Sequence, residues 1–104
     1  MQRIALTGIK PTGNIHIGNY FGAIKPALAL TEKYLGLYFV ADMHALNSHP
    51  TRKELQDMIY EVAASWMASG LDTNKAVFFK QSDIPEIPEL TTILSAVTPK
   101  GLMN

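Results

Sequence analysis

Three short apolar runs, separated by segments with helical periodicity, constrain the fold of this chain more than any other feature. The runs are Ile4–Thr7, Leu37–Ala41 and Ala76–Phe79. Runs of this length and composition are typical of strands buried on both faces of a sheet that helices cover. Strands that alternate with helices favour a parallel sheet with right-handed crossovers. The sequence therefore predicts an α/β fold that is half of a doubly wound nucleotide-binding domain, whose full form has about twice as many strands.

The segments between and after these runs have helical patterns: one begins near Gly18 or Asn19, one follows Thr51 and ends at Gly70, and one spans 85–97. Pro26 interrupts the first, so a kink or break is expected there, and Gly36 can end it. Thr51 and Glu54 have the spacing of a capping box. The apolar stripe of this second helix predicts its buried face, and its early charges predict a solvated face: Arg52, Lys53, Glu54, Asp57 and Glu61.

Composition excludes several classes of function. The 104 residues form one domain or part of one, and the net charge of zero argues against a stand-alone nucleic-acid binder with a strongly basic surface. The chain has no cysteine, and its three histidines do not have zinc-ligand spacing, so we expect no metal held by the protein. No apolar run approaches the ~20 residues of a membrane helix, and no signal peptide is visible. We therefore expect a soluble, cytoplasmic protein with no membrane contact.

The segment from Gly8 to Tyr20 is the most informative for function, because it joins the first strand to the first helix. In doubly wound folds ligands bind at the carboxyl ends of strands, where free amides at a helix start favour a phosphate. Two glycines without a Cβ would admit a nucleotide, and four polar side chains could face it: Gly8 and Gly18, with Lys10, Thr12, His16 and Asn19. The loop has neither common phosphate-binding signature. An ordinary connection in which His16 only caps a helix is equally compatible with the spacing.

Pro11–Ala23 (PTGNIHIGNYFGA) resembles the first signature of the class I aminoacyl-tRNA synthetases, in the form typical of their tryptophan-specific branch. Two further segments match the family: Asp42-Met-His-Ala45 after the second strand, and Ser69–Asp72 followed by a strand and Gln81-Ser82. The resemblance covers nearly the whole chain with consistent spacing. It implies that the chain is the N-terminal half of a Rossmann-like class I catalytic domain.

The resemblance also implies a reaction. Tryptophan would attack the α-phosphate of ATP, which carries Mg²⁺, and the tryptophanyl group would then pass to the 3′-terminal ribose of tRNA(Trp). Family roles would make His16 and Asn19 catalytic, and would assign the ATP site to Gly8, Lys10, Pro11, Thr12, Gly18 and Asn19. Leu6, Ala41 and His44 would lie near the indole. The family also implies a homodimer or another form of self-association.

The chain departs from the complete family pattern. It lacks the lysine-rich K-M-S-K-S loop and the anticodon-reading domain, so residues 1–104 are expected to be an N-terminal portion that is inactive or strongly impaired by itself. In the parent sheet the first strand would be central. One edge of Ile4–Thr7 would therefore lack its partner strand here and is expected to pair with another chain. Three alternatives remain. Two are enzymes that Asn19 disfavours: a tyrosine-type synthetase, and a nucleotidyltransferase of the same fold with an H-x-G-H box. The third is a non-catalytic nucleotide-binding or interaction module.

Overall fold

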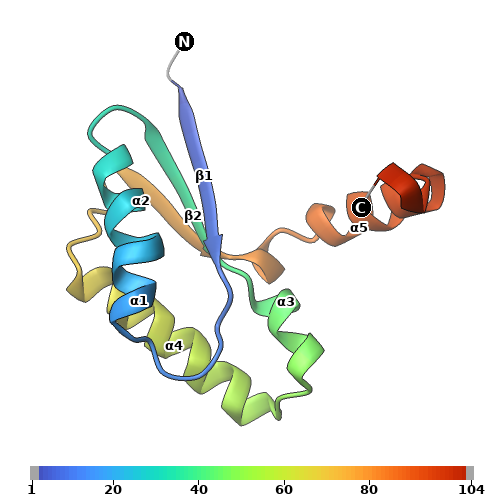
Figure 1. Ribbon diagram of the computed structural model, residues 1–104, viewed down its shortest axis with the longest axis horizontal. Helices are drawn as coiled ribbons and strands as arrows, with labels where there is room; N and C mark the ends of the chain where they lie inside the picture. The colour runs from blue at the N-terminus through green and yellow to red at the C-terminus, as the bar shows by residue number, and fades with distance from the viewer. Residues whose placement is uncertain (1–2, 103–104) are drawn as a thin grey trace.

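The computed structural model describes residues 3–102 and contains one parallel sheet (Figure 1). Its strands are β1 (Ile4–Ile9), β2 (Leu35–Val40) and β3 (Ala76–Lys80), in the spatial order β1-β2-β3. Both neighbouring pairs are parallel, with Leu37 of β2 opposite Leu6 on one side and Val77 on the other. The predicted alternation of strands and helices and the parallel sheet are confirmed.

The strands are longer than the apolar runs that predicted them. β1 continues through Gly8 to Ile9, and β2 begins at Leu35. The interpretation of Gly36 as a helix stop is therefore wrong, because Gly36 lies inside β2 opposite Ala76. A Cβ at Gly36 would lie 2.9 Å from the Cβ of Ala76, so the close packing of neighbouring strands requires glycine here.

The first helical segment runs without a break from Ile17 to Leu30. It consists of α1 (Ile17–Asn19), a π-helical turn η1 (Tyr20–Ile24) and α2 (Lys25–Leu30). The break expected at Pro26 does not occur, because a wider turn precedes the proline. In that turn the amide of Lys25 donates to the carbonyl of Tyr20, which relieves the crowding of a proline ring against an ordinary α-helical turn.

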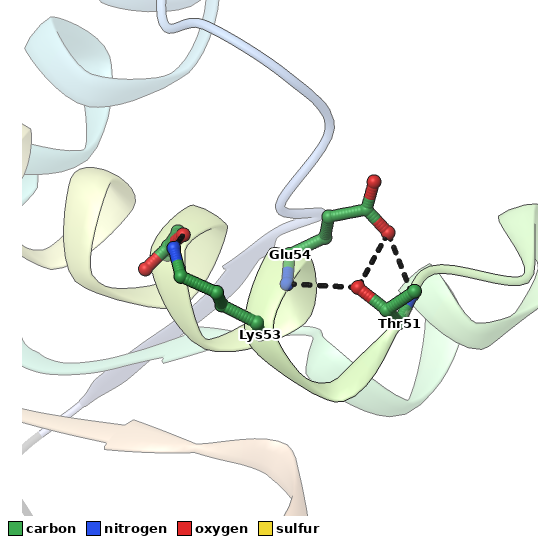
Figure 2. A network of polar contacts seen from close by, with 4 residues as sticks. Thr51, Lys53 and Glu54 are labelled. Atoms are coloured by element: carbon green, nitrogen blue, oxygen red, sulfur yellow. Dashed lines mark hydrogen bonds and ion pairs between the residues drawn. The ribbon is translucent and has the colours of Figure 1, made fainter.

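The longest helix, α4 (Arg52–Ala68), begins with the predicted capping box (Figure 2). The amide of Glu54 donates to Thr51 Oγ1 over 3.3 Å, and Glu54 Oε2 accepts from the amide of Thr51 over 2.7 Å. Lys53 forms an exposed ion pair with Asp57 one turn further on. The two capping contacts satisfy free amides at the helix start.

The core lies between the sheet and the helices α1, α2 and α4, which cover the same face (Figure 1). Right-handed crossovers that advance along a sheet in one direction place their helices on one side. Tyr38 and Trp66 are both fully buried, with ring centroids 5.2 Å apart, and the Tyr38 hydroxyl donates to the carbonyl of Ala27. The other buried members of this cluster are Ile9, Ile24, Val40, Val62, Leu71 and Ala76.

The opposite face of the sheet is apolar and open within residues 3–102. Leu6 is 66% exposed and Val77 is 51% exposed, so the prediction of strands buried on both faces is not met in the described part of the chain. The third strand is followed by a 3₁₀ turn η3 (Gln81–Asp83) and helix α5 (Glu86–Val97), which projects away from the sheet (Figure 1). Among residues 3–102, no helix is long and apolar enough to cross a membrane.

Replacing Thr51 with Ala is expected to lower the free energy of unfolding by about 1 kcal/mol, because it removes the side-chain acceptor of the α4 cap. Denaturant unfolding followed by the fluorescence of Trp66, the single tryptophan, measures the change. Thr73→Ala in an exposed turn is the matched control. An equal effect of both substitutions would contradict the capping role.

The same cap makes stability depend on pH. The Thr51 hydroxyl, and after it the Thr51 amide, hold the pKa of Glu54 below its ordinary value of 4.5. The stabilisation by the carboxylate is therefore complete above pH 4.5 and is lost as the pH falls through the lowered pKa. The stability difference between the parent chain and Glu54→Gln is expected to shrink over that acid range. A difference that stays constant down to pH 2 would contradict this assignment.

The 104-residue chain by itself is expected to self-associate, because β1 is an edge strand of the described sheet and the open face is apolar. Leu6→Lys, on that face, is expected to shift sedimentation toward the monomer. Tyr60→Lys on the outer side of α4 is the control, since Tyr60 is 74% exposed and lies on another face. A parent chain that remains monomeric at high concentration would overturn the prediction.

Candidate active site

The loop of residues 10–16 leaves the carboxyl end of β1 and runs beside α4 before the first helix begins (Figure 1). Pro11 is fully buried, and Gly13 has a φ of 58°, in the left-handed region that glycine adopts without strain. The amide of Ile15 donates to Glu61 Oε1 over 3.3 Å, and the amide of Gly13 lies 3.4 Å from the sulfur of Met58. Helix α4 therefore fixes the path of the loop.

His16 and Asn19 form a reciprocal capping box at the start of the first helix. The amide of Gly18 donates to His16 Nδ1 over 3.1 Å, and the amide of His16 donates to Asn19 Oδ1 over 3.0 Å. An Nδ1 that accepts a hydrogen bond carries no proton, so the neutral imidazole carries its proton on Nε2. The cap thus presents an N–H donor from an exposed ring at the helix start.

The two glycines predicted to admit a nucleotide make room for side chains of this chain. A Cβ at Gly18 would lie 2.9 Å from Cε1 of His16, so glycine lets the imidazole fold back over the helix start. Gly8 lies inside β1, not in the loop, and a Cβ there would lie 2.4 Å from the ring of Phe39. Gly18 and Gly8 each allow a close approach, but the groups that approach them in this structure are the side chains of His16 and Phe39, respectively.

Residues from β1 and β2 meet at the carboxyl edge of the sheet, that is, the end at which the three parallel strands finish. The amide of Ala41 donates to the carbonyl of Ile9 over 2.9 Å, which holds Ala41 against the end of β1, one residue before Lys10. Lys10 is half-buried and Thr12 is exposed. Leu6 is not part of this edge: it lies on the open face of the sheet, three residues before the strand ends.

His44 lies on the short helix α3 (Asp42–Ala45), which follows β2, and it lines a cavity of about 270 Å³. Residues of α3 and the next turn form one wall, and residues of η3 and α5 form the other: Met43, His44 and Asn47, facing Gln81, Ile87, Pro88, Thr91 and Thr92. The cavity mixes apolar and hydrogen-bonding groups. It can therefore accept a molecule with an apolar body and a polar edge.

Two anchoring carboxylates were missed by the sequence analysis. Glu61 was assigned to a solvated face, although it follows Met58 by three residues and so shares that side of α4. Asp42 was quoted within a motif without a role, yet it accepts hydrogen bonds from Ser82. The sequence does carry a signal for the contact between Asp42 and Ser82. Asp42 follows β2 by two positions, Ser82 follows β3 by two positions, and these two strands are neighbours.

No three His, Cys, Asp or Glu side chains gather into a metal site among the described residues. The polar groups at the carboxyl edge are instead the imidazoles of His16 and His44, the Asp42 carboxylate, amides, hydroxyls and a lysine. A three-stranded parallel sheet whose first loop enters a helix capped by His16 and Asn19 has the architecture of half of a Rossmann-type doubly wound fold.

Comparison with known proteins identifies the family within this class. The family model described as tRNA synthetases class I (W and Y) matches residues 2–104. The chain belongs to this family.

Relatives of high sequence identity are named tryptophan–tRNA ligase. The tryptophan–tRNA ligase of Pseudomonas aeruginosa is 50% identical over 101 residues, covering 95% of this chain and 22% of the relative. That of Fusobacterium nucleatum is 46% identical over 100 residues, covering 96% of this chain and 31% of the relative. The chain thus spans less than a third of the length of these relatives.

Solved structures confirm the fold. The tryptophanyl-tRNA synthetase of Campylobacter jejuni in complex with ADP and tryptophan superposes with a TM-score of 0.87 and 44% identity, covering 97% of this chain and 31% of that one. The enzyme of Mycoplasma pneumoniae superposes with a TM-score of 0.90 and 32% identity, covering 97% and 29%. The described sheet and helices are therefore part of a Rossmann-like class I catalytic domain.

Replacing Glu61 with Ala is expected to release the loop from α4, because the amide of Ile15 loses its acceptor. Amide hydrogen exchange at Ile15 is expected to accelerate about tenfold, as for the loss of a hydrogen bond to a charged group. Glu61→Gln keeps an acceptor oxygen and is the matched control. Unchanged exchange in the alanine variant would show that Glu61 does not hold the loop.

Proposed function

We propose that this chain is the N-terminal portion of the catalytic domain of an ATP-dependent tryptophan–tRNA ligase. The observation that carries the proposal is the His16–Asn19 capping box at the carboxyl edge, in a chain 50% identical to a tryptophan–tRNA ligase. The remainder of such a domain and an anticodon-reading domain would lie outside residues 1–104. The open apolar face of the sheet is compatible with this, because a doubly wound domain carries helices on both faces.

In the proposed reaction a carboxylate oxygen of tryptophan attacks the α-phosphorus of ATP, which binds as its Mg²⁺ complex. The new C–O–P linkage forms tryptophanyl-AMP, and the bond to pyrophosphate breaks. A 3′-terminal ribose hydroxyl of tRNA(Trp) then attacks the carbonyl carbon and releases AMP. Neither step requires a covalent intermediate with the protein, so positioning and charge stabilisation carry the catalysis.

The ATP half of the site is assigned to the loop and the helix start. His16 Nε2–H would donate to a phosphate oxygen as negative charge builds up, while Lys10 would contribute a positive charge and Thr12 a hydroxyl. Asn19 acts by holding the backbone of His16, and Gly18 and Asn19 would pack against the nucleotide. Pro11, buried against the core, and Gly8 in β1 support this loop rather than reach into it.

The amino-acid half is assigned to the other end of the same edge. Ala41 and His44 would lie beside the indole, and the adjoining cavity has the mixed lining that an indole with an amino and a carboxylate group requires. Leu6 lies on the open face of the sheet, so it would contribute to the indole pocket only from that face. The C. jejuni neighbour is complexed with ADP and tryptophan, which supports a site for a nucleotide and for tryptophan in this family.

Tryptophan-dependent exchange of pyrophosphate into ATP tests the proposal, with the product of the complete reading frame beside the 104-residue chain. Exchange that requires tryptophan, and not tyrosine, by the complete product is the expected result, and the short chain is expected to be inactive or strongly impaired. Tyrosine-dependent exchange would move the assignment to the tyrosine-type enzymes. No exchange by a folded complete product would favour a nucleotide-binding module. The complete enzyme is further expected to act in the cytoplasm and to self-associate.

Two substitutions at His16 separate its capping role from its proposed catalytic role. Asn is a good N-cap residue but has no imidazole N–H, so His16→Asn is expected to keep the helix start and lower the exchange rate 100-fold or more. His16→Ala is expected to lose both exchange and stability, measured by pyrophosphate exchange and denaturant unfolding. Full activity of the Asn variant would reduce His16 to a structural cap.

A further inference from the structure

Asp42 is the one charged side chain that is buried in the described part of the chain, with 5% of its surface exposed. A buried carboxylate is costly unless hydrogen-bond donors surround it. The hydrogen-bond donors to its two oxygens therefore show which segments this carboxylate connects.

The donors to Asp42 come from two different turns. Oδ1 accepts from the amide of Met43 and from the amide of Ser82, each over 3.0 Å, and Oδ2 accepts from the Ser82 hydroxyl. Val40 and Lys80 are opposite each other at the ends of β2 and β3, and Asp42 and Ser82 each follow by two residues. The carboxylate thus joins the turns that follow two neighbouring strands, although 40 residues separate them in the chain.

These bonds set the distance between the two walls of the cavity. Met43 and His44 follow Asp42 directly, and Gln81 precedes Ser82 directly, and all three line the cavity. The η3 turn that carries Ser82 is itself closed by Lys80, whose amide and then side chain hold the pKa of Asp83 below its usual range.

The direction of helix α5 depends on the hydrogen bonds between Asp42 and Ser82. It follows η3 and projects away from the sheet (Figure 1), and its hydrogen bonds within the described residues are local. The hydrogen bonds of Ser82 to Asp42 therefore link the segment that leads into α5 to the end of β2.

The loop assigned to ATP has separate anchors. It is attached to α4 through Glu61 and Met58 and to the helix start through the His16–Asn19 cap. None of these contacts involves Asp42 or Ser82. A change at Asp42 should therefore disturb one half of the site and leave the other in place.

We propose that Asp42 is a positioning residue for the amino-acid half of the site: by binding Ser82 it sets the spacing between His44 and the wall formed by η3 and α5. The inference rests on the proposed function. Asp42 itself does not touch substrate in this proposal, because it is buried and accepts from Met43 and Ser82. Its role is to keep the cavity at the width that tryptophan requires.

The test uses the complete protein and measures pyrophosphate exchange with tryptophan and ATP varied separately. Asp42→Ala is expected to raise the KM for tryptophan tenfold or more while the KM for ATP stays within twofold. Asp42→Asn is expected to restore most of the affinity, because its oxygen accepts both amides and the Ser82 hydroxyl can rotate to accept from its NH₂ group. Asp72→Ala is the matched control, since Asp72 also accepts turn amides but is exposed and precedes β3.

Ser82→Ala provides an independent arm that keeps the buried carboxylate. It is expected to raise the KM for tryptophan by less than Asp42→Ala does, because it removes only the hydroxyl contact. The double variant is expected to be no worse than Asp42→Ala, which already removes that contact together with the two amide contacts. Amide exchange in η3 and α5 should accelerate in Asp42→Ala while residues 10–16 keep their protection.

The outcomes separate the two hypotheses. No tryptophan-dependent exchange by the parent protein would overturn the proposed function and this inference with it. An active parent whose Asp42→Ala variant loses affinity for both substrates equally, or whose Asp42→Asn variant is as impaired as Asp42→Ala, would overturn this inference alone. Additive effects of Asp42→Ala and Ser82→Ala would do the same.

Discussion

The parallel pairing of β1, β2 and β3 is the constraint on which the rest of the structure depends. Parallel neighbours cannot be joined by a tight turn, so each connection must cross back along the sheet, here mainly as helix. Because the crossovers share one hand and one direction, both helical connections cover the same face and meet over Tyr38 and Trp66. The same geometry brings the carboxyl ends of all three strands to one edge, where the residues of the candidate site lie.

That edge is held by two sets of contacts that share no residue. Glu61 and Met58 of α4 hold the loop that leads to His16, whereas Asp42 holds the turn that leads to α5. Under the proposed function the site brings two substrates together, and each half would then be ordered by its own anchors. The sheet joins the two halves, because both sets of contacts lie at the ends of its strands.

The capping box at His16 unites the two interpretations that the sequence left open. The spacing of His16 and Asn19 was compatible with a simple helix cap or with a ligand-binding pair. The structure contains the cap, and because Nδ1 accepts from the amide of Gly18, the neutral ring carries its proton on Nε2. A structural role and a proposed catalytic role are thus compatible, since the hydrogen bond that ends the loop also selects the tautomer.

The sequence by itself determined the order of strands and helices, the start of α4 at Thr51 and the loop that carries the candidate site. Those features depend on local properties, namely apolar runs, capping residues and glycine or proline in turns. Only the tertiary structure decided that Pro26 follows a wide turn, that Glu61 faces the loop, that Leu6 lies on the open face, and that Asp42 meets Ser82. These outcomes depend on contacts between residues far apart in the chain, and their positions become related only when the sheet register is formed.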